Sequence, residues 1–269
     1  MVTLGPNRDW DARTYHRVAQ PHATWGANVL DRLQLRGDET VLDAGCGSGR
    51  VTAGLIERLP HGRVIAADVS PTMLEQARAT LAEYGDRVTF VEADLVRIDQ
   101  VLRQPVDGIF STATFHWIQD HATLFAALFN ALEPGGLLVA QCGGGANLAR
   151  FMRTADSVAE QSPFVEALSG AGRLWRHQYG ANETAERLRG AGFANVEVWL
   201  EDSPQTFEDA AALAAFARTV VLSRHVAVLP ERLRDEFVDA VVAAVAETEG
   251  KYSLDYVRLN MDARKPASA

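Results

Sequence analysis

Three acidic residues with similar spacing are the residues of this sequence best suited to hold a ligand. Asp43, Asp68 and Asp94 lie about 25 positions apart, and each closely follows a short apolar run. Such runs are typical of buried parallel strands, whose carboxyl ends meet at one edge of a sheet. Carboxylates at three strand ends would hold a cationic ligand and accept hydrogen bonds from its hydroxyl and amino groups.

A glycine-rich turn begins just after the first of these acids. The residues Val-Leu-Asp-Ala-Gly-Cys-Gly-Ser-Gly start at Val41 and precede a helical pattern. Gly45, Gly47 and Gly49 allow a sharp turn and let a ligand approach the backbone. A dinucleotide fingerprint would place its third glycine at position 50, where this sequence has Arg50, and an acid at the strand end would repel phosphate. The turn therefore favours a ligand with ammonium and sulfonium groups, and an ordinary strand–helix turn is the alternative.

Asp68 has the spacing of a ribose-binding residue. It lies 25 positions after Asp43 and directly after the expected second strand, 63–67. A carboxylate at this position can accept hydrogen bonds from both ribose hydroxyls and would repel a 2′-phosphate. The alternative is that Asp68 only begins a hydrated loop.

Strand and helix patterns alternate along the chain. We expect strands ending near 42 and spanning 63–67, 87–91, 106–111, 137–141, 196–201 and 255–263. Helices are expected within 9–35 and at 50–59, 71–84, 123–132, 147–168, 182–190, 207–223 and 230–250. This alternation predicts an α/β fold with a doubly wound, mostly parallel seven-stranded sheet that includes one antiparallel strand.

The chain has more helices than such a sheet needs. We expect an N-terminal helical lid and the cofactor-binding half of a Rossmann-like domain in 1–145. A helical cap over the substrate pocket is expected in 146–185 and 207–250. The remaining helix and closing strands then occupy 186–206 and 251–269.

The composition limits the kinds of partner and environment that we expect for this protein. The 269-residue chain is 47% hydrophobic and has a net charge of −9, which disfavours a nucleic-acid-binding surface. No apolar run approaches the ~20 residues of a membrane span, and no signal-peptide pattern is present, so we expect a cytoplasmic protein. Two cysteines, expected at the ends of non-adjacent strands, predict neither a disulfide nor a metal site. A monomer and a dimer are both left open.

Residues 41–49, the acids at the strand ends and Pro134-Gly135-Gly136 together resemble class I S-adenosylmethionine-dependent methyltransferases over about residues 10–145. Trp10, Tyr15 and Gln20 resemble the N-terminal signature of the trans-aconitate and malonyl-carrier branch. The resemblance implies S-adenosyl-L-methionine as cofactor and S-adenosyl-L-homocysteine as product.

The same resemblance implies positions for the cofactor. The glycine turn would carry the methionine part, with Tyr15 and Gln20 facing it and Asp43 nearby. Asp94 would accept the adenine amine while the Leu95 amide meets the ring. The remaining predicted cofactor contacts are Val69, Met73 and Ser111.

His116 is the one ionisable residue that the motif order places near the reactive methyl group. It could remove a proton from a hydroxyl or hold an acceptor oxygen, or simply pack with Trp117. A carboxylate acceptor needs no base, because it is already an anion at neutral pH. The predicted substrate contacts are Trp117, Tyr179, Tyr256 and Arg258; further candidate cations are Arg150, Arg153, Arg173, Arg176, Arg218 and Arg224.

We therefore expect transfer of a methyl group to a small molecule, onto an oxygen of a carboxylate or a hydroxyl. C- or N-methylation of a natural product is the alternative within this class. A catalytically inactive S-adenosylmethionine-binding regulatory module is the alternative from another class. An NAD-linked oxidoreductase is disfavoured by Arg50 and Asp43.

Overall fold

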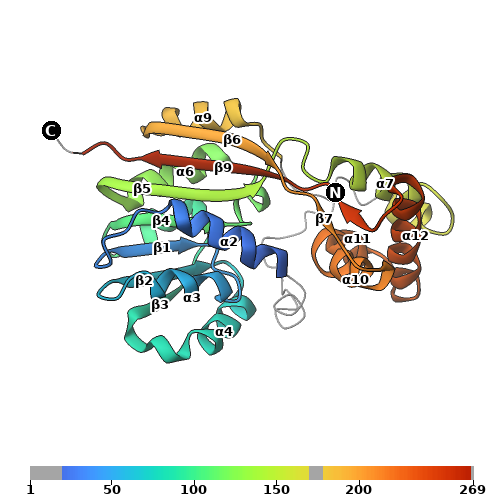
Figure 1. The fold of residues 1–269 in the computed structure, drawn as a ribbon, viewed down its shortest axis with the longest axis horizontal. Helices are drawn as coiled ribbons and strands as arrows, with labels where there is room; N and C mark the ends of the chain where they lie inside the picture. Colours follow the sequence, from blue (N-terminus) through green and yellow to red (C-terminus); the bar gives the residue numbers. More distant parts are fainter. Residues whose placement is uncertain (1–19, 170–177, 268–269) are drawn as a thin grey trace.

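Seven strands form the central sheet in the computed structural model, which describes residues 20–169 and 178–267 (Figure 1). The predictions for Trp10 and Tyr15, and for the side chain of Gln20, lie outside the described residues. The sheet has the order β3-β2-β1-β4-β5-β9-β6. Its strands are β1 (Thr40–Ala44), β2 (Arg63–Asp68), β3 (Val88–Glu92), β4 (Val106–Thr112), β5 (Leu132–Gly143), β6 (Ala194–Asp202) and β9 (Val257–Arg264).

The direction of the strands confirms the predicted fold class. Strands β1 to β5 run parallel, whereas β9 is antiparallel to both β5 and β6. The strand order reverses between β1 and β4, where an open α/β sheet leaves a crevice at its carboxyl edge. The glycine turn that follows β1 lies at this reversal point.

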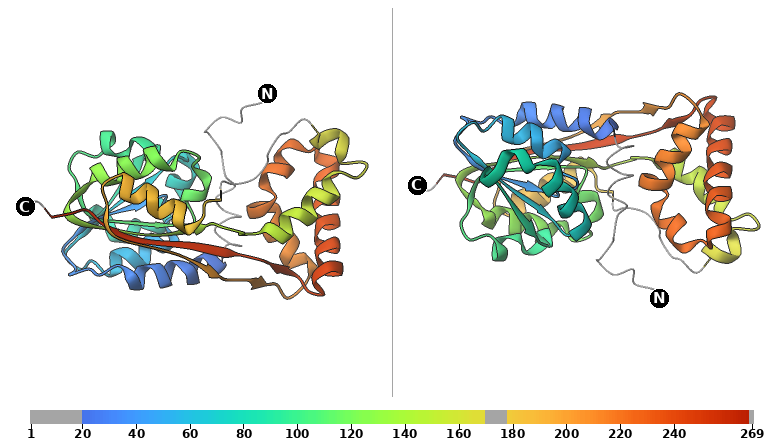
Figure 2. Two further views of the ribbon diagram at one scale, coloured as in Figure 1. Left: turned by 90° about the horizontal axis from the view of Figure 1, so that it is seen from above. Right: turned by 90° about the horizontal axis from the view of Figure 1, so that it is seen from below.

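Helices cover both faces of the sheet, as the alternating pattern predicts (Figure 2). One face carries α2 (Gln20–Arg32), α3 (Arg50–Glu57) and α4 (Pro71–Thr80), whose apolar residues share one core with β1 and β2. The other face carries α5 (Ile98–Val101), α6 (His121–Ala131) and α9 (Ala181–Gly190), which pack in a second core. Short 3-10 turns η1 (Ala82–Arg87), η2 (Leu95–Arg97) and η3 (Phe115–Trp117) connect these elements.

A separate group of helices lies beyond the carboxyl ends of the parallel strands (Figure 1). Its members are α7 (Ala149–Ala159), α8 (Val165–Leu168), α10 (Ala210–Phe216), the π-helix η4 (Ala217–Val221), α11 (Ser223–Val228) and α12 (Glu231–Glu249). We call this group the cap. Among the residues that the structure describes, its buried apolar core comes from residues 148–168 and 213–256 and from Trp25 of α2. A two-stranded ribbon of β7 (Gln205–Thr206) and β8 (Ser253–Leu254) joins the cap to the sheet.

Several boundaries differ from the sequence-based expectation. The expected helix 207–223 is interrupted by η4, whose run of β-branched residues Thr219-Val220-Val221 disfavours a regular α-helix. The helix expected at 71–84 ends at Thr80, and Gly85 then takes φ 54° and ψ −132°, outside the right-handed helical region. Strand β5 begins at Leu132 and thus includes the Pro-Gly-Gly that we expected only to precede it.

The predicted cap boundary at residue 185 falls inside α9. Leu188 of this helix packs in the core under the sheet, and Ala181 packs against the same core. The whole of α9 therefore covers the sheet rather than the cap. Among the described helices, none is both long and apolar enough to cross a membrane.

Candidate functional site

The glycine turn is fixed to the end of β2 by backbone hydrogen bonds. Gly45 N and Cys46 N donate to the Ala67 carbonyl at 2.8 and 3.0 Å, and Gly49 caps α3 in the left-handed conformation with φ 80°. A side-chain carbon at Gly45 would lie 2.2–2.7 Å from Thr114, whereas one at Gly47 would meet nothing within 4 Å. The turn is thus closed on its Gly45 side and open at Gly47, which is the shape that backbone contact with a ligand requires.

Asp43 lies beneath this turn, with 2% of its surface exposed. Its carboxylate accepts a hydrogen bond of 2.6 Å from the Thr52 hydroxyl. The pKa of Asp43 is raised to about 7, mainly by burial and also by the nearby Asp68 charge, although the Thr52 hydrogen bond acts in the opposite direction. A cation bound at this edge would favour the ionised carboxylate.

Asp68 connects the turn to the second strand end. Its Oδ2 accepts from Gly47 N and its Oδ1 from Ser70 N, both at 2.9 Å. Burial raises the pKa of Asp68, although these backbone hydrogen bonds lower it. The next residue, Val69, exposes 43% of its apolar side chain. An acid with a free lone pair on each oxygen, next to an apolar surface, fits a ribose joined to a flat base.

Asp94 occupies the third strand end but is more exposed. Its Oδ1 accepts from Val96 N at 3.2 Å, so it caps the short η2 turn. The Leu95 side chain is buried under the sheet, and only its backbone can meet a ligand there.

The other two predicted cofactor contacts have buried side chains. Met73 is buried at the start of α4. Ser111 is also buried, and its hydroxyl donates to the Ala44 carbonyl at 2.6 Å, which joins β4 to β1.

His116 lies in η3, just beyond β4, and is 6% exposed. Gly143 N, at the end of β5, donates a hydrogen bond of 3.2 Å to His116 Nδ1. A neutral imidazole whose Nδ1 accepts carries its proton on Nε2. In this tautomer His116 can hold an acceptor oxygen by donating from Nε2, but it has no lone pair there with which to remove a proton.

Two predicted substrate contacts are connected to His116, Trp117 by a ring contact and Arg258 through its pairing with Gly143. The Trp117 ring is 5.3 Å from the His116 ring, between their centroids. Arg258 is the second residue of β9 and lies opposite Gly143 in the strand register, and only 2% of its surface is exposed. Its Nε donates to Gln141 Oε1 at 3.2 Å. A buried guanidinium therefore lies at the carboxyl edge of the sheet, one strand away from the His116–Gly143 contact.

The two predicted tyrosines are placed differently. Tyr256 is buried against Trp25, with their ring centroids 4.9 Å apart, and close to Arg258. The Tyr179 hydroxyl donates to the Gln119 carbonyl at 2.5 Å, and the Tyr179 ring lies 4.1 Å from the Arg187 guanidinium. Tyr179 thus contacts the helices that cover the sheet rather than the group around Arg258.

A buried polar network behind Arg258 was not predicted from the sequence. Gln141 Nε2 donates to Asn260 Oδ1 at 2.8 Å, and Arg32 of α2 donates to the same oxygen. Arg32 also donates to the Ala140 carbonyl at 2.9 Å, and its Nη2 lies 3.2 Å from Asp262 Oδ1. The sequence feature that could have indicated this network is the presence of two polar residues, Gln141 and Asn260, inside otherwise apolar strand patterns. Buried polar groups in a strand usually have partners in the tertiary structure.

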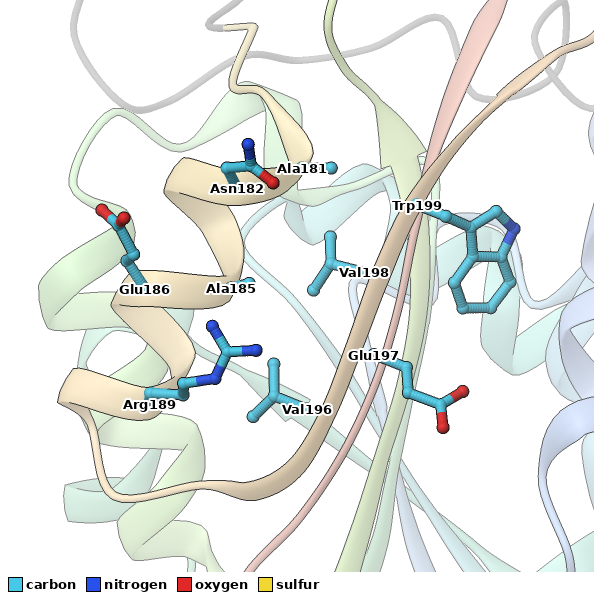
Figure 3. Close-up of a pocket in the computed structure, with 9 residues that line it drawn as sticks. All are labelled: Ala181, Asn182, Ala185, Glu186, Arg189, Val196, Glu197, Val198 and Trp199. Carbon is cyan, nitrogen blue, oxygen red and sulfur yellow. The ribbon is translucent and has the colours of Figure 1, made fainter.

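A groove of about 560 Å³ lies elsewhere, between α9 and the edge strand β6 (Figure 3). Val196 and Val198 point toward α9, whereas Glu197 and Trp199 lie on the other side of the strand. Its other lining residues are Ala181, Asn182, Ala185, Glu186 and Arg189. None of the predicted site residues lines this groove, and within the described part of the chain we find no group of three metal-binding side chains.

Comparison with known proteins identifies relatives along the whole chain. A family model described as a methyltransferase domain matches residues 41–136. The trans-aconitate 2-methyltransferase of Methylobacterium radiotolerans is 34% identical, over 96% of this chain and 98% of that protein. The protein of the same name from Methylobacterium nodulans is 29% identical with the same coverage.

A solved structure with the same fold is phosphoethanolamine N-methyltransferase 2 of Haemonchus contortus, in complex with phosphomonomethylethanolamine and S-adenosylhomocysteine. It superposes with a TM-score of 0.61 at 19% identity, over 95% of this chain and 57% of that chain.

Removing the second strand-end acid should weaken cofactor binding. Asp68→Ala removes the expected acceptor of two ribose hydroxyls. Because each hydrogen bond to a charged group is worth about 1.5–3 kcal/mol, the Kd for S-adenosylhomocysteine should rise by tenfold or more. Titration calorimetry measures this change. Glu92→Ala is the matched control, because Glu92 is an exposed acid at the end of the neighbouring strand, in register with Asp68. An unchanged Kd for Asp68→Ala would remove Asp68 from the site.

Binding of the cationic cofactor should release a proton near neutral pH. With a pKa of about 7, Asp43 is partly protonated in the free protein, and a bound cation lowers that pKa. The affinity for S-adenosylmethionine should therefore increase as the pH rises from about 5 to 7 and level off above it. Calorimetry in buffers of different ionisation enthalpy measures the number of protons released on binding. Asp43→Asn should abolish the pH dependence; an equally steep dependence in this variant would contradict the assignment.

Alanine at Gly45 should mainly reduce stability, whereas alanine at Gly47 should mainly weaken cofactor binding. Gly45→Ala places a methyl group against Thr114 at φ 90°, so we expect a loss of at least 1–3 kcal/mol in the free energy of unfolding. Gly47→Ala meets open space and costs only about 1 kcal/mol for its φ of 53°, but it should weaken S-adenosylhomocysteine binding about tenfold or more. Thermal denaturation and calorimetry separate the effects. Unchanged binding by Gly47→Ala would show that no ligand approaches this residue.

Proposed function

Because the chain belongs to the trans-aconitate 2-methyltransferase family of S-adenosylmethionine-dependent methyltransferases, we propose that it methylates a carboxylate oxygen of trans-aconitate or a similar polycarboxylate. The family relationship fixes the class of enzyme and the cofactor. The observation that carries the choice of a carboxylate is the buried Arg258 beside the His116–Gly143 contact.

The strand-end acids and the glycine turn fit the cofactor. When bound, S-adenosylmethionine supplies a methyl group that its sulfonium already activates for transfer. In this proposal Asp68 accepts the ribose hydroxyls, Asp94 accepts the adenine amine, and the exposed Val69 side chain offers an apolar surface to the base. The open backbone at Gly47 admits the methionine part.

The acceptor is then held by donors rather than activated by a base. A carboxylate is ionised at neutral pH and needs only alignment with the methyl–sulfur bond and exclusion of water. Arg258 supplies a charged hydrogen-bond donor and His116 a neutral one at Nε2. The cap lies beyond this edge of the sheet (Figure 1), and Trp25 of α2 places its ring 4.3 Å from the Arg258 guanidinium.

Methylation of a hydroxyl, a carbon or an amine would require chemistry that this site does not favour. A hydroxyl acceptor must lose its proton, and the tautomer of His116 that Gly143 selects leaves no lone pair at Nε2. Methylation at carbon has the same requirement. A neutral amine needs no base, but it would gain nothing from a buried guanidinium, which repels a cationic product.

Loss of the buried guanidinium should remove most of the activity toward a carboxylate. Truncating one member of a buried charge pair costs about 2–5 kcal/mol, so Arg258→Ala should lower kcat/KM for trans-aconitate by at least about 30-fold. Transfer of labelled methyl to trans-aconitate measures the rate, and S-adenosylhomocysteine affinity reports whether the variant folds.

Arg264→Ala is the matched control, since Arg264 ends the same strand at the opposite edge of the sheet. If the unaltered enzyme methylates no carboxylic acid, the proposed acceptor is wrong. If Arg258→Ala is as active as Arg264→Ala, the acceptor is held elsewhere.

A further inference from the structure

Thr114 connects the glycine turn to the turn that contains His116. It lies between β4 and η3 and is partly buried. Its hydroxyl lies 2.9 Å from the Thr112 carbonyl and 3.2 Å from the Gly45 carbonyl, and it donates to both. A hydroxyl carries one proton, so the two carbonyls share it. The contact with Gly45 joins the end of β1 to the end of β4.

The Thr114 side chain also fills the space that Gly45 leaves empty. A side-chain carbon added at Gly45 would lie within 2.7 Å of the Oγ1, Cγ2 and Cβ atoms of Thr114. Both the hydroxyl and the methyl group of the threonine therefore lie against the glycine turn. A hydrogen bond and close packing together hold Thr114 and the turn in one relative position.

The backbone around Thr114 is fixed from the other side. Ala113 has φ 55°, in the left-handed region that is unfavourable for a residue with a side chain, and its amide donates to the Gln141 carbonyl of β5 at 2.8 Å. The Thr114 carbonyl accepts from Trp117 N at 2.9 Å, which closes η3. Threonine commonly caps the helical turn that follows it, but the Thr114 hydroxyl does not cap η3. The loop instead brings this hydroxyl to the glycine turn.

We propose that Thr114 is a positioning residue that sets the alignment between the methyl donor and the acceptor. The glycine turn holds the donor, η3 holds the acceptor beside His116, and Thr114 contacts the first and begins the second. A misplacement of about 1 Å can lower the rate of such a transfer about 100-fold. Loss of the Thr114 hydroxyl should therefore affect alignment more than the affinity for either ligand. This inference rests on the proposed function, because it takes the acceptor site to be beside His116.

Two variants separate the hydroxyl from the methyl group. Thr114→Val removes the hydroxyl and keeps the branched shape, whereas Thr114→Ser keeps the hydroxyl. With trans-aconitate and labelled S-adenosylmethionine, Thr114→Val should lower kcat about 10- to 100-fold and change the acceptor KM and the Kd for S-adenosylhomocysteine less than about threefold. Thr114→Ser should recover most of the rate.

The stoichiometry of S-adenosylhomocysteine binding distinguishes positioning from a purely structural role. A variant that only folds less completely would lose binding sites and rate together, whereas Thr114→Val should keep its binding sites. Thr248→Val is the matched control, because the Thr248 hydroxyl also donates to a backbone carbonyl, that of Ala244, at an exposed position of α12. It should leave kcat unchanged.

Hydrogen exchange followed by mass spectrometry tests the same coupling without an acceptor. S-adenosylhomocysteine should slow amide exchange in residues 43–49 and, through Thr114, in residues 115–118, where the Trp117 and Ile118 amides are bonded in η3. In Thr114→Val the protection of 43–49 should remain and that of 115–118 should be lost. Thr114→Ser should restore it.

Three results would overturn the role of Thr114: an unchanged kcat in Thr114→Val, equal protection of both segments in that variant, or no protection of 115–118 in the unaltered enzyme. If the unaltered enzyme methylates no carboxylic acid, the proposed acceptor is wrong. The exchange measurement still decides whether Thr114 couples the two turns, so the two failures are distinguished.

Discussion

The attachment of the glycine turn to the end of β2 is the constraint on which the cofactor site depends. Two backbone amides of the turn, at Gly45 and Cys46, share the Ala67 carbonyl, and a third, at Gly47, donates to Asp68. These bonds bring the carboxyl ends of the first two strands together and place two acids within one small volume. The burial of Asp43, and to a smaller extent its repulsion by Asp68, raise the pKa of Asp43, so a bound cation would stabilise the ionised form of this carboxylate.

The acceptor side of the site is built on the opposite half of the sheet by a different means. The antiparallel strand β9 returns its first residues to the carboxyl edge, where the parallel strands end. That reversal explains how Arg258, which is close to the end of the chain, comes to lie beside Gly143 and the turn containing His116. The network of Gln141, Asn260 and Arg32 then fixes this region to α2, so the helix preceding β1 and the last strand form one unit.

The cap has its own apolar core, joined to the rest of the protein by Trp25 and by the ribbon of β7 and β8. An independent core lets the cap vary without disturbing the sheet, because each buries its own apolar surface. Contacts such as that between Arg224 and Trp117 cross from one core to the other. Such crossing contacts are where a sheet common to many methyltransferases can acquire a preference for one acceptor.

The sequence by itself determined the sheet, the glycine turn and the acids Asp43, Asp68 and Asp94, because these features are local: strand periodicity, glycine spacing and a residue at a strand end lie within a few positions of one another. Only the tertiary structure decided which arginine is buried at the site, which nitrogen of His116 carries the proton, and that Tyr179 contacts Gln119 instead. Those properties depend on residues separated by tens to more than a hundred positions. No local pattern records such distances, because they are set by how β9, α2 and the cap pack against the sheet.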